Sequence, residues 1–207
     1  EAARKLGYSV SQTMMIAQRL YESGFITYMR TDSFNLSDLA LGTAKEAILE
    51  SYGEKYYKFR QYHTKSKGAQ EAHEAIRPTY IAKAEIDGTA QERKLYDLIR
   101  KRTIACQMAD AELERTTISV DISGLKEKFV ATGEVVVFDG FLQVYHESTD
   151  DDQEKEQGNT LLPVVHLQDT LQLKEATATE RFTQRPARYT EATLVRRLEE
   201  LGIGRPS

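Results

Sequence analysis

The segment 24–33, Gly-Phe-Ile-Thr-Tyr-Met-Arg-Thr-Asp-Ser, brings a tyrosine and an arginine together in a way that suits phosphate chemistry. Tyr28 and Arg30 are two residues apart, so on an extended backbone both side chains point to one face. An arginine fork can hold two phosphate oxygens while a phenol attacks phosphorus. A half-buried strand tyrosine beside a surface arginine has the same spacing, and the chain holds 11 tyrosines, so spacing alone does not select Tyr28.

A second run of reactive residue types is Glu-Ala-His-Glu-Ala-Ile-Arg-Pro at 71–78. The imidazole of His73 titrates near neutrality and can orient a phosphate or relay a proton. A surface or helix-capping histidine is the alternative interpretation. Arg77 precedes Pro78, a position at which helices commonly end.

The remaining histidines and the single cysteine do not indicate a metal site. His63, His146 and His166 are far apart and lack the short spacing of metal ligands. Cys106 falls on the apolar stripe of an expected helix, which places it in the core. The sequence also has no phosphate-binding loop, no CxxC pair and no GxGxxG run.

The elements that must position these residues change character along the chain. Three helices are expected within residues 1–112, from apolar stripes and capping residues. They run from Ser11 to Gly24, from Ser37 to Gly53, and from Thr89, which has capping-box spacing to Glu92, to Cys106.

Near Arg115 the apolar period changes from 3.6 to 2, which is typical of strands. Strands are expected at 118–122 and 129–137, then after an Asp139-Gly140 turn at 141–145, and at 161–167 and 171–176, with an exposed acidic loop at 147–159. A last helix follows Thr190 and ends at Gly202. The pattern predicts an α+β fold of several domains, with a helical domain at 1–113, a β-rich domain at 114–183, and the start of a second helical domain at 184–207.

Composition sets broad limits on function. The net charge of −4 argues against a nucleic-acid binder when taken alone, but the acidic run at 147–156 hides a basic stretch at 185–207. No apolar run approaches the ~18 residues of a membrane-spanning helix. One cysteine fits a reducing compartment. The chain starts without Met, which predicts a segment excised from a longer protein.

The segment 24–33 resembles the active-site motif of bacterial DNA topoisomerase I, a type IA topoisomerase, and Met29 favours that branch of the family. Further segments match in the order in which the family has them. They are 13–22, 70–78, 138–140, 186–192 and 201–207, so the resemblance covers essentially the whole chain.

The resemblance implies that Tyr28 cleaves one DNA strand and keeps its 5′-phosphate as a phosphotyrosyl intermediate. Arg30 would hold the scissile phosphate, and His73 would position the phosphate and a proton. Strand passage and religation would then relax negatively supercoiled DNA without ATP. By the same resemblance Arg77, Arg205 and Ser207 are candidates for DNA contact, the last two at the start of a single-strand-binding groove.

The resemblance also implies what lies outside this chain. The family has a Toprim domain that binds Mg²⁺, and no equivalent acidic motif is present here, so the chain itself is expected to hold no cofactor. Residues 114–183 would form the second of two segments of an arch domain, followed by a C-terminal helix. We therefore expect this fragment alone to be inactive, and the full-length enzyme to be a cytoplasmic monomer at the bacterial nucleoid, acting on single-stranded segments of DNA and on no membrane.

Two interpretations from other classes stay open at this point. One is a non-catalytic, DNA-binding helical module, and the other is a structural hinge domain. An exposed Tyr28 beside Arg30 and His73 would favour the enzyme, whereas a Tyr28 buried in a core would favour the structural role.

Overall fold

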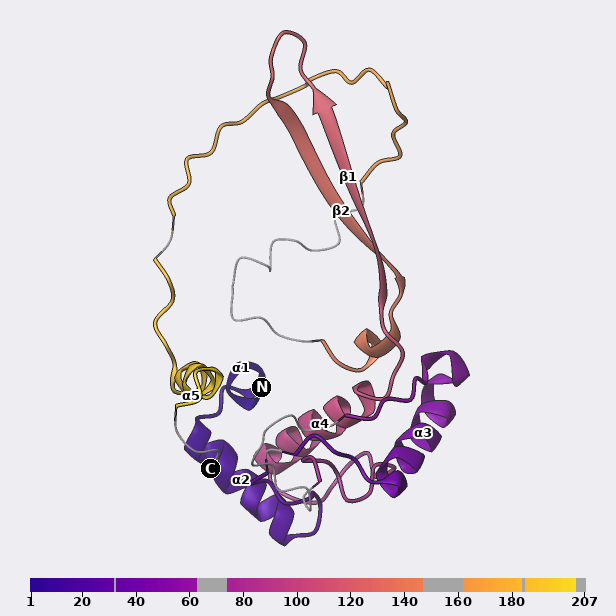
Figure 1. Ribbon diagram of the computed structural model, residues 1–207, viewed down its shortest axis with the longest axis vertical. Coiled ribbons are helices and arrows are strands. Elements are labelled where there is room, and N and C mark those ends of the chain that lie inside the picture. Colours follow the sequence, from indigo (N-terminus) through magenta and orange to yellow (C-terminus); the bar gives the residue numbers. More distant parts are fainter. Residues whose placement is uncertain (32, 63–73, 147–161, 184, 204–207) are drawn as a thin grey trace.

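The computed structural model describes residues 1–31, 33–62, 74–146, 162–183 and 185–203. Four helices gather at one end of the molecule, and a two-stranded ribbon projects from them (Figure 1). The helices are α1 (Ala2–Leu6), α2 (Val10–Glu22), α3 (Asp38–Tyr52) and α4 (Ala90–Ala105). Short 3-10 helices η1 (Glu54–Tyr56) and η2 (Gly140–Gln143) follow α3 and the ribbon.

The helices begin at side-chain caps. The hydroxyls of Ser37 and Thr89 accept hydrogen bonds from backbone N–H groups of the first turns of α3 and α4, and Thr89 completes a capping box with Glu92. Both starts were predicted from the sequence and are confirmed. Helix α2 begins earlier than predicted because Ser9, not Ser11, accepts the N–H of Gln12 at 3.1 Å.

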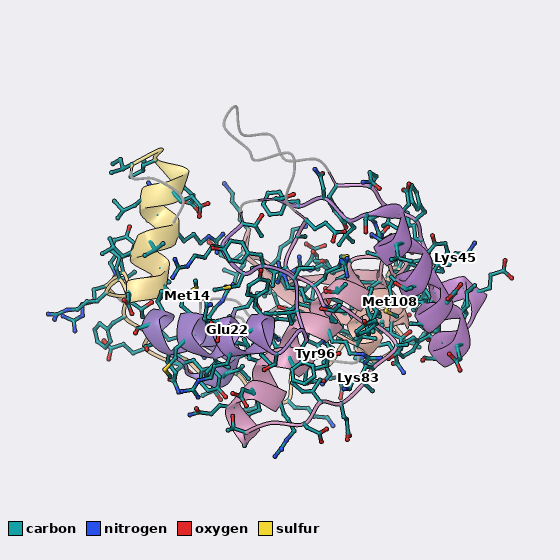
Figure 2. The ribbon with its side chains drawn as sticks, turned by 90° about the horizontal axis from the view of Figure 1, so that it is seen from below. Met14, Glu22, Lys45, Lys83, Tyr96 and Met108 are labelled. Atoms are coloured by element: carbon teal, nitrogen blue, oxygen red, sulfur yellow. The ribbon has the colours of Figure 1, made fainter. Side chains whose placement is uncertain are left out.

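The helical unit is held by two apolar clusters (Figure 2). The first lies between α2 and α4 and includes Ile16, Leu20 and Tyr96, whose hydroxyl donates to the carbonyl of Lys83 at 2.7 Å. The second lies between α3 and the end of α4 and includes Ile48 and Met108, both fully buried. Apolar burial of this kind is the main force that holds short helices together.

The projecting ribbon pairs β1 (Glu112–Asp121) with β2 (Lys128–Phe138) in antiparallel register. Its far end pairs Asp121 with Lys128, which also form an ion pair at 2.8 Å. The two predicted strands are confirmed and are longer than predicted. Both faces of the ribbon are largely exposed, because in the described part of the chain no third strand pairs with it.

The strand predicted at 141–145 was wrong, since η2 occupies this segment. Gly140 has φ 48° and turns the chain beneath α4, where the N–H of Phe141 donates to the carbonyl of Ala109 at 2.9 Å. Phe141 and Val144 then pack against the second apolar cluster. The spacing of these apolar residues is compatible with the buried side of a tight turn as well as with a strand, so the sequence pattern did not distinguish the two.

The strands predicted at 161–167 and 171–176 are also wrong for the residues that the structure describes, 162–176, which form no strand. Most apolar side chains there are exposed, Val164 by 88% and Leu167 by 98%. A strand satisfies its backbone groups only through a partner strand, and alternation in the sequence cannot supply one.

Helix α5 (Glu191–Glu200) was predicted correctly, with Thr190 as its cap and Gly202 in a left-handed conformation just beyond its end. Its apolar residues Leu194 and Leu201 are exposed. The observed mixture of helices and one antiparallel ribbon confirms the α+β class. The domain boundaries at 113/114 and 183/184 stay predictions.

Gly140→Ala tests the base of the ribbon. An added Cβ would lie 2.6 Å from the carbonyl oxygen of Ala109 and closer still to that of Asp110, and neither backbone oxygen can move away. Because the φ of Gly140 is also left-handed, we expect Gly140→Ala to lower the free energy of unfolding of the 207-residue chain, measured in urea, by about 2–4 kcal/mol.

The matched control is Gly124→Ala, at the tip of the ribbon. Gly124 has φ 83°, but nothing lies within 4 Å of the added Cβ. We therefore expect the free energy of unfolding to fall by about 1 kcal/mol, from conformational strain alone. Equal losses in the two variants would show that contact with the α4 end does not fix Gly140.

Candidate active site

Tyr28 lies on a short segment that leaves the C-terminal end of α2. The helix stops at Gly24, whose φ of 72° suits glycine, with the N–H of Phe25 donating to the carbonyl of Leu20 at 2.9 Å. Ile26 then pairs with Pro78 in an isolated antiparallel bridge. The chain therefore passes from helix to extended backbone just before Tyr28.

Burial alternates along this segment. Ile26 and Met29 are 2% and 5% exposed and belong to the cluster between α2 and α4, whereas Tyr28 is 39% exposed and Arg30 is exposed as well. The buried Met29 between them fixes the backbone so that both polar side chains face solvent. Both side chains are exposed, and Tyr28 is not a core tyrosine.

A second tyrosine flanks Tyr28. The ring of Tyr21, in the last turn of α2, meets the ring of Tyr28 edge-on, with centroids 5.2 Å apart and planes at 66°. Edge-to-face aromatic pairs contribute about 0.5–1.5 kcal/mol, enough to favour one ring orientation. Tyr21 is 41% exposed, so two tyrosines of equal exposure stand side by side here.

Thr27 fastens the tyrosine segment to residues 75–79. Its N–H donates to the carbonyl of Arg77 at 2.9 Å, and the N–H of Thr79 donates to the carbonyl of Phe25 at 2.9 Å. Its hydroxyl donates to the carbonyl of Ala75 at 2.8 Å and accepts the N–H of Arg77 at 2.9 Å. One side chain thus satisfies two backbone groups of a segment about 50 residues away.

Arg77 and Glu74 form a partly buried ion pair next to this junction. Arg77 Nη2 lies 2.5 Å from Glu74 Oε2, and Nη1 donates to the carbonyl of Pro78 at 2.9 Å. The second carboxylate oxygen of Glu74 accepts the N–H of Ser37, the cap of α3, at 2.7 Å. Glu74 therefore joins Arg77 to the N-terminus of α3, where the helix dipole favours a negative charge.

The pKa of Glu74 reflects these contacts. Partial burial alone would raise the pKa of this carboxyl, but the hydrogen bonds from Ser37 and Arg77 outweigh burial and lower the pKa below its ordinary value. Glu74 is thus ionised at neutral pH, as the ion pair requires.

Several residues singled out in the sequence lie outside the described residues: His73, Arg205 and Ser207. Their predicted roles stay predictions. The sequence reasoning missed Tyr21, Thr27 and Glu74 as parts of the site. Thr27 adjoins Tyr28 and Glu74 stands three residues before Arg77, but the hydrogen bonds of Thr27 with Ala75 and Arg77 and that of Glu74 with Ser37 join residues distant in sequence.

The described residues do not suit a metal ion. Among them, no three His, Cys, Asp or Glu side chains come together as a metal site requires. None of their helices has the length and apolar character to cross a membrane. The arrangement that this surface does offer is an exposed phenol and an exposed guanidinium on one rigid segment.

Known proteins resemble this chain over its whole length. A family model described as DNA topoisomerase matches residues 1–207. A DNA topoisomerase 1 of Zymomonas mobilis is 47% identical over all of this chain and 17% of its own length. Those of Rickettsia felis and Streptomyces coelicolor are each 46% identical over all of this chain, and over 28% and 23% of their own lengths.

A solved structure shows the same fold. The full-length topoisomerase I from Thermotoga maritima superimposes with a TM-score of 0.74 at 35% sequence identity, over 100% of this chain and 34% of that one. The present chain therefore spans about a third or less of the length of each of these relatives.

Thr27→Val tests the junction beneath Tyr28. Valine keeps the shape of threonine but removes the hydroxyl, which leaves the carbonyl of Ala75 and the N–H of Arg77 without this partner. We expect a loss of about 2 kcal/mol in the free energy of unfolding, because an unsatisfied, partly buried backbone group costs about 1–3 kcal/mol. Thr27→Ser retains the hydroxyl and should lose less than half as much; equal losses would show that the threonine methyl group stabilises the junction as much as the hydroxyl does.

Proposed function

The chain belongs to the DNA topoisomerase family, and on that premise we propose that it carries the nucleophile, Tyr28, of a type IA enzyme. In this proposal Tyr28 cleaves one strand of DNA, another segment passes through the break, and the strand is resealed. Negatively supercoiled DNA is thereby relaxed. The observation that carries the proposal is the exposure of Tyr28 beside Arg30, on a segment whose neighbouring residues are buried.

The chemical step is a transesterification. The phenolic oxygen of Tyr28 forms a bond to phosphorus, and the bond from phosphorus to the 3′-oxygen breaks. The phenolic proton is lost and the 3′-oxygen leaves as a hydroxyl, while the 5′-phosphate stays on the tyrosine. Attack by that 3′-hydroxyl reverses every bond change. One phosphodiester replaces another at each stage, so no ATP is required.

Arg30 would assist by its charge. Tyrosine phenols are mostly protonated near neutrality and are weak nucleophiles. A guanidinium that binds the scissile phosphate offsets the extra charge of the five-coordinate phosphorus in the transition state. The Tyr21 ring, in edge contact with Tyr28, would reduce the number of orientations in which the phenol waits for the phosphate.

Other parts of the proposal rest on family resemblance. His73 is proposed to position the scissile phosphate and a proton, and Arg205 and Ser207 to contact single-stranded DNA. Mg²⁺ is proposed to bind the full-length enzyme outside this chain. The full-length enzyme is proposed to act as a monomer at the bacterial nucleoid. The rival function, a helical module that only holds DNA, predicts no covalent intermediate.

Tyr28→Phe in the full-length protein should abolish the covalent DNA adduct and relaxation, because the variant lacks the oxygen that attacks phosphorus. Binding of a single-stranded oligonucleotide should be largely unchanged. Tyr21→Phe is the matched control, since it removes the same atom from an equally exposed neighbour. Adduct at Tyr21, or persistent adduct in Tyr28→Phe, would refute the assignment, and no adduct in the unaltered protein would favour the binding module.

Arg30→Ala should slow adduct formation by about 10²–10³-fold, the usual effect of removing one preorganised donor to a developing charge. Arg30→Lys should restore only part of the rate because it offers a point charge and no bidentate fork. Quenched single-turnover cleavage of a labelled oligonucleotide measures both rates. A rate near that of the unaltered protein for Arg30→Ala would show that Arg30 does not act on the phosphate.

A further inference from the structure

Two arginines, Arg30 and Arg77, lie on or next to the tyrosine segment, and their environments differ. Arg30 is exposed, whereas the side chain of Arg77 is only 11% exposed and donates to Glu74 and to the carbonyl of Pro78. Phosphate ligands need donors that can reach DNA. The sequence alone predicts a DNA contact for both arginines, but only one of them presents its guanidinium to solvent.

The backbone of Arg77 is held as firmly as its side chain. Its N–H and carbonyl both bond to Thr27, and Ala75, two residues earlier, donates its N–H to the carbonyl of Asn35 at 2.8 Å. Glu74 extends the connection to the N–H of Ser37 at 2.7 Å. Three parts of the chain thus meet at one ion pair: the tyrosine segment, the segment 74–79, and the N-terminus of α3.

We infer that Arg77 is a positioning residue that acts through Glu74 to hold the tyrosine segment, and is not a phosphate ligand. This inference rests on the proposed role of Tyr28. Breaking the ion pair would free the segment 74–79 from α3 and loosen the strand pairing that precedes Tyr28. The phenol and Arg30 would then lose their fixed relation to an incoming phosphate.

The surroundings of Arg77 give little support for an anion there. Its Nε has no hydrogen-bond partner among the described residues, but this atom is buried and is not accessible to a phosphate from solvent. Arg77 also borders a cavity of about 340 Å³ beside α3. The wall of that cavity carries Glu46 and Glu50, whose charges oppose a phosphate, and Arg100 there donates to the carbonyl of Ile81 at 2.9 Å.

A double-mutant cycle in the full-length protein tests the link between the two residues. Arg77→Gln and Glu74→Gln should each slow formation of the Tyr28 adduct by about tenfold, because displacements of ~1 Å at a reacting group can cost as much as 100-fold. The double variant should be no slower than either single variant, since both changes break the same connection. Multiplying effects, near 100-fold in the double variant, would overturn the inference.

The salt dependence of oligonucleotide binding separates positioning from phosphate binding. For single strands the slope of log K against log salt changes by about 0.7 for each phosphate that the protein no longer neutralises. Arg77→Gln should leave the slope unchanged, and Arg30→Gln, the matched exposed arginine, should reduce its magnitude by about 0.7. A reduction of that size in Arg77→Gln would identify a phosphate ligand and overturn the inference.

Arg77→Lys covers the case in which Arg77→Gln fails to fold. Lysine keeps a charge for a phosphate but lacks the fork that reaches Glu74 and the Pro78 carbonyl together. Positioning predicts that Arg77→Lys slows adduct formation as much as loss of the charge does, about tenfold, whereas a phosphate ligand predicts a smaller decrease because lysine keeps the charge. Absence of any Tyr28 adduct in the unaltered protein would contradict the proposed function instead, and the salt slopes would still decide the role of Arg77.

Discussion

The pairing of Phe25–Thr27 with Arg77–Thr79 is the interaction on which the arrangement around Tyr28 depends. Two backbone hydrogen bonds and the Thr27 hydroxyl join segments 50 residues apart. Closing a loop of that length has an entropic cost, which the burial of Ile26 and Pro78 at the centre of the pairing helps to offset. Without it, the chain beyond Gly24 would have no defined direction as it approaches Tyr28.

On the tyrosine segment, apolar burial fixes the path of the backbone, and charged partners determine which arginine is exposed. Ile26 and Met29 are buried between α2 and α4 and determine where the backbone runs. The two arginines differ in exposure because Arg30 follows Met29 into solvent, whereas the side chain of Arg77 is held by Glu74.

The sequence was sufficient to predict the structure where interactions between nearby residues determine it. Helix starts at Ser37 and Thr89 follow from a side chain and a backbone N–H within three residues, and the two long strands follow from alternation. It was insufficient where distant partners decide. The segments 141–145 and 162–176 alternate like strands, but the first packs under α4 and the second meets no strand among the described residues.

The same limit applies to the site. Tyr28 and Arg30 can be picked out because their spacing and family motif are contiguous in sequence. Thr27, Glu74 and Tyr21 cannot, because their roles come from contacts across the fold. A sequence motif can point to candidate reactive groups, but it does not reveal the residues that hold those groups in place.

The exposed ribbon has a consequence for the dynamics of the molecule. Its strands are joined by a full ladder of hydrogen bonds, yet neither face is covered by the described residues. Separating β1 from β2 toward the tip therefore exposes little new apolar surface, whereas opening the junction at Thr27 disturbs a packed core. Local opening should be frequent in the ribbon and rare at the tyrosine segment, so backbone amides exchange with solvent quickly in one and slowly in the other. The molecule therefore combines a ribbon that opens readily with a packed helical unit, and Gly140 lies where the ribbon meets that unit.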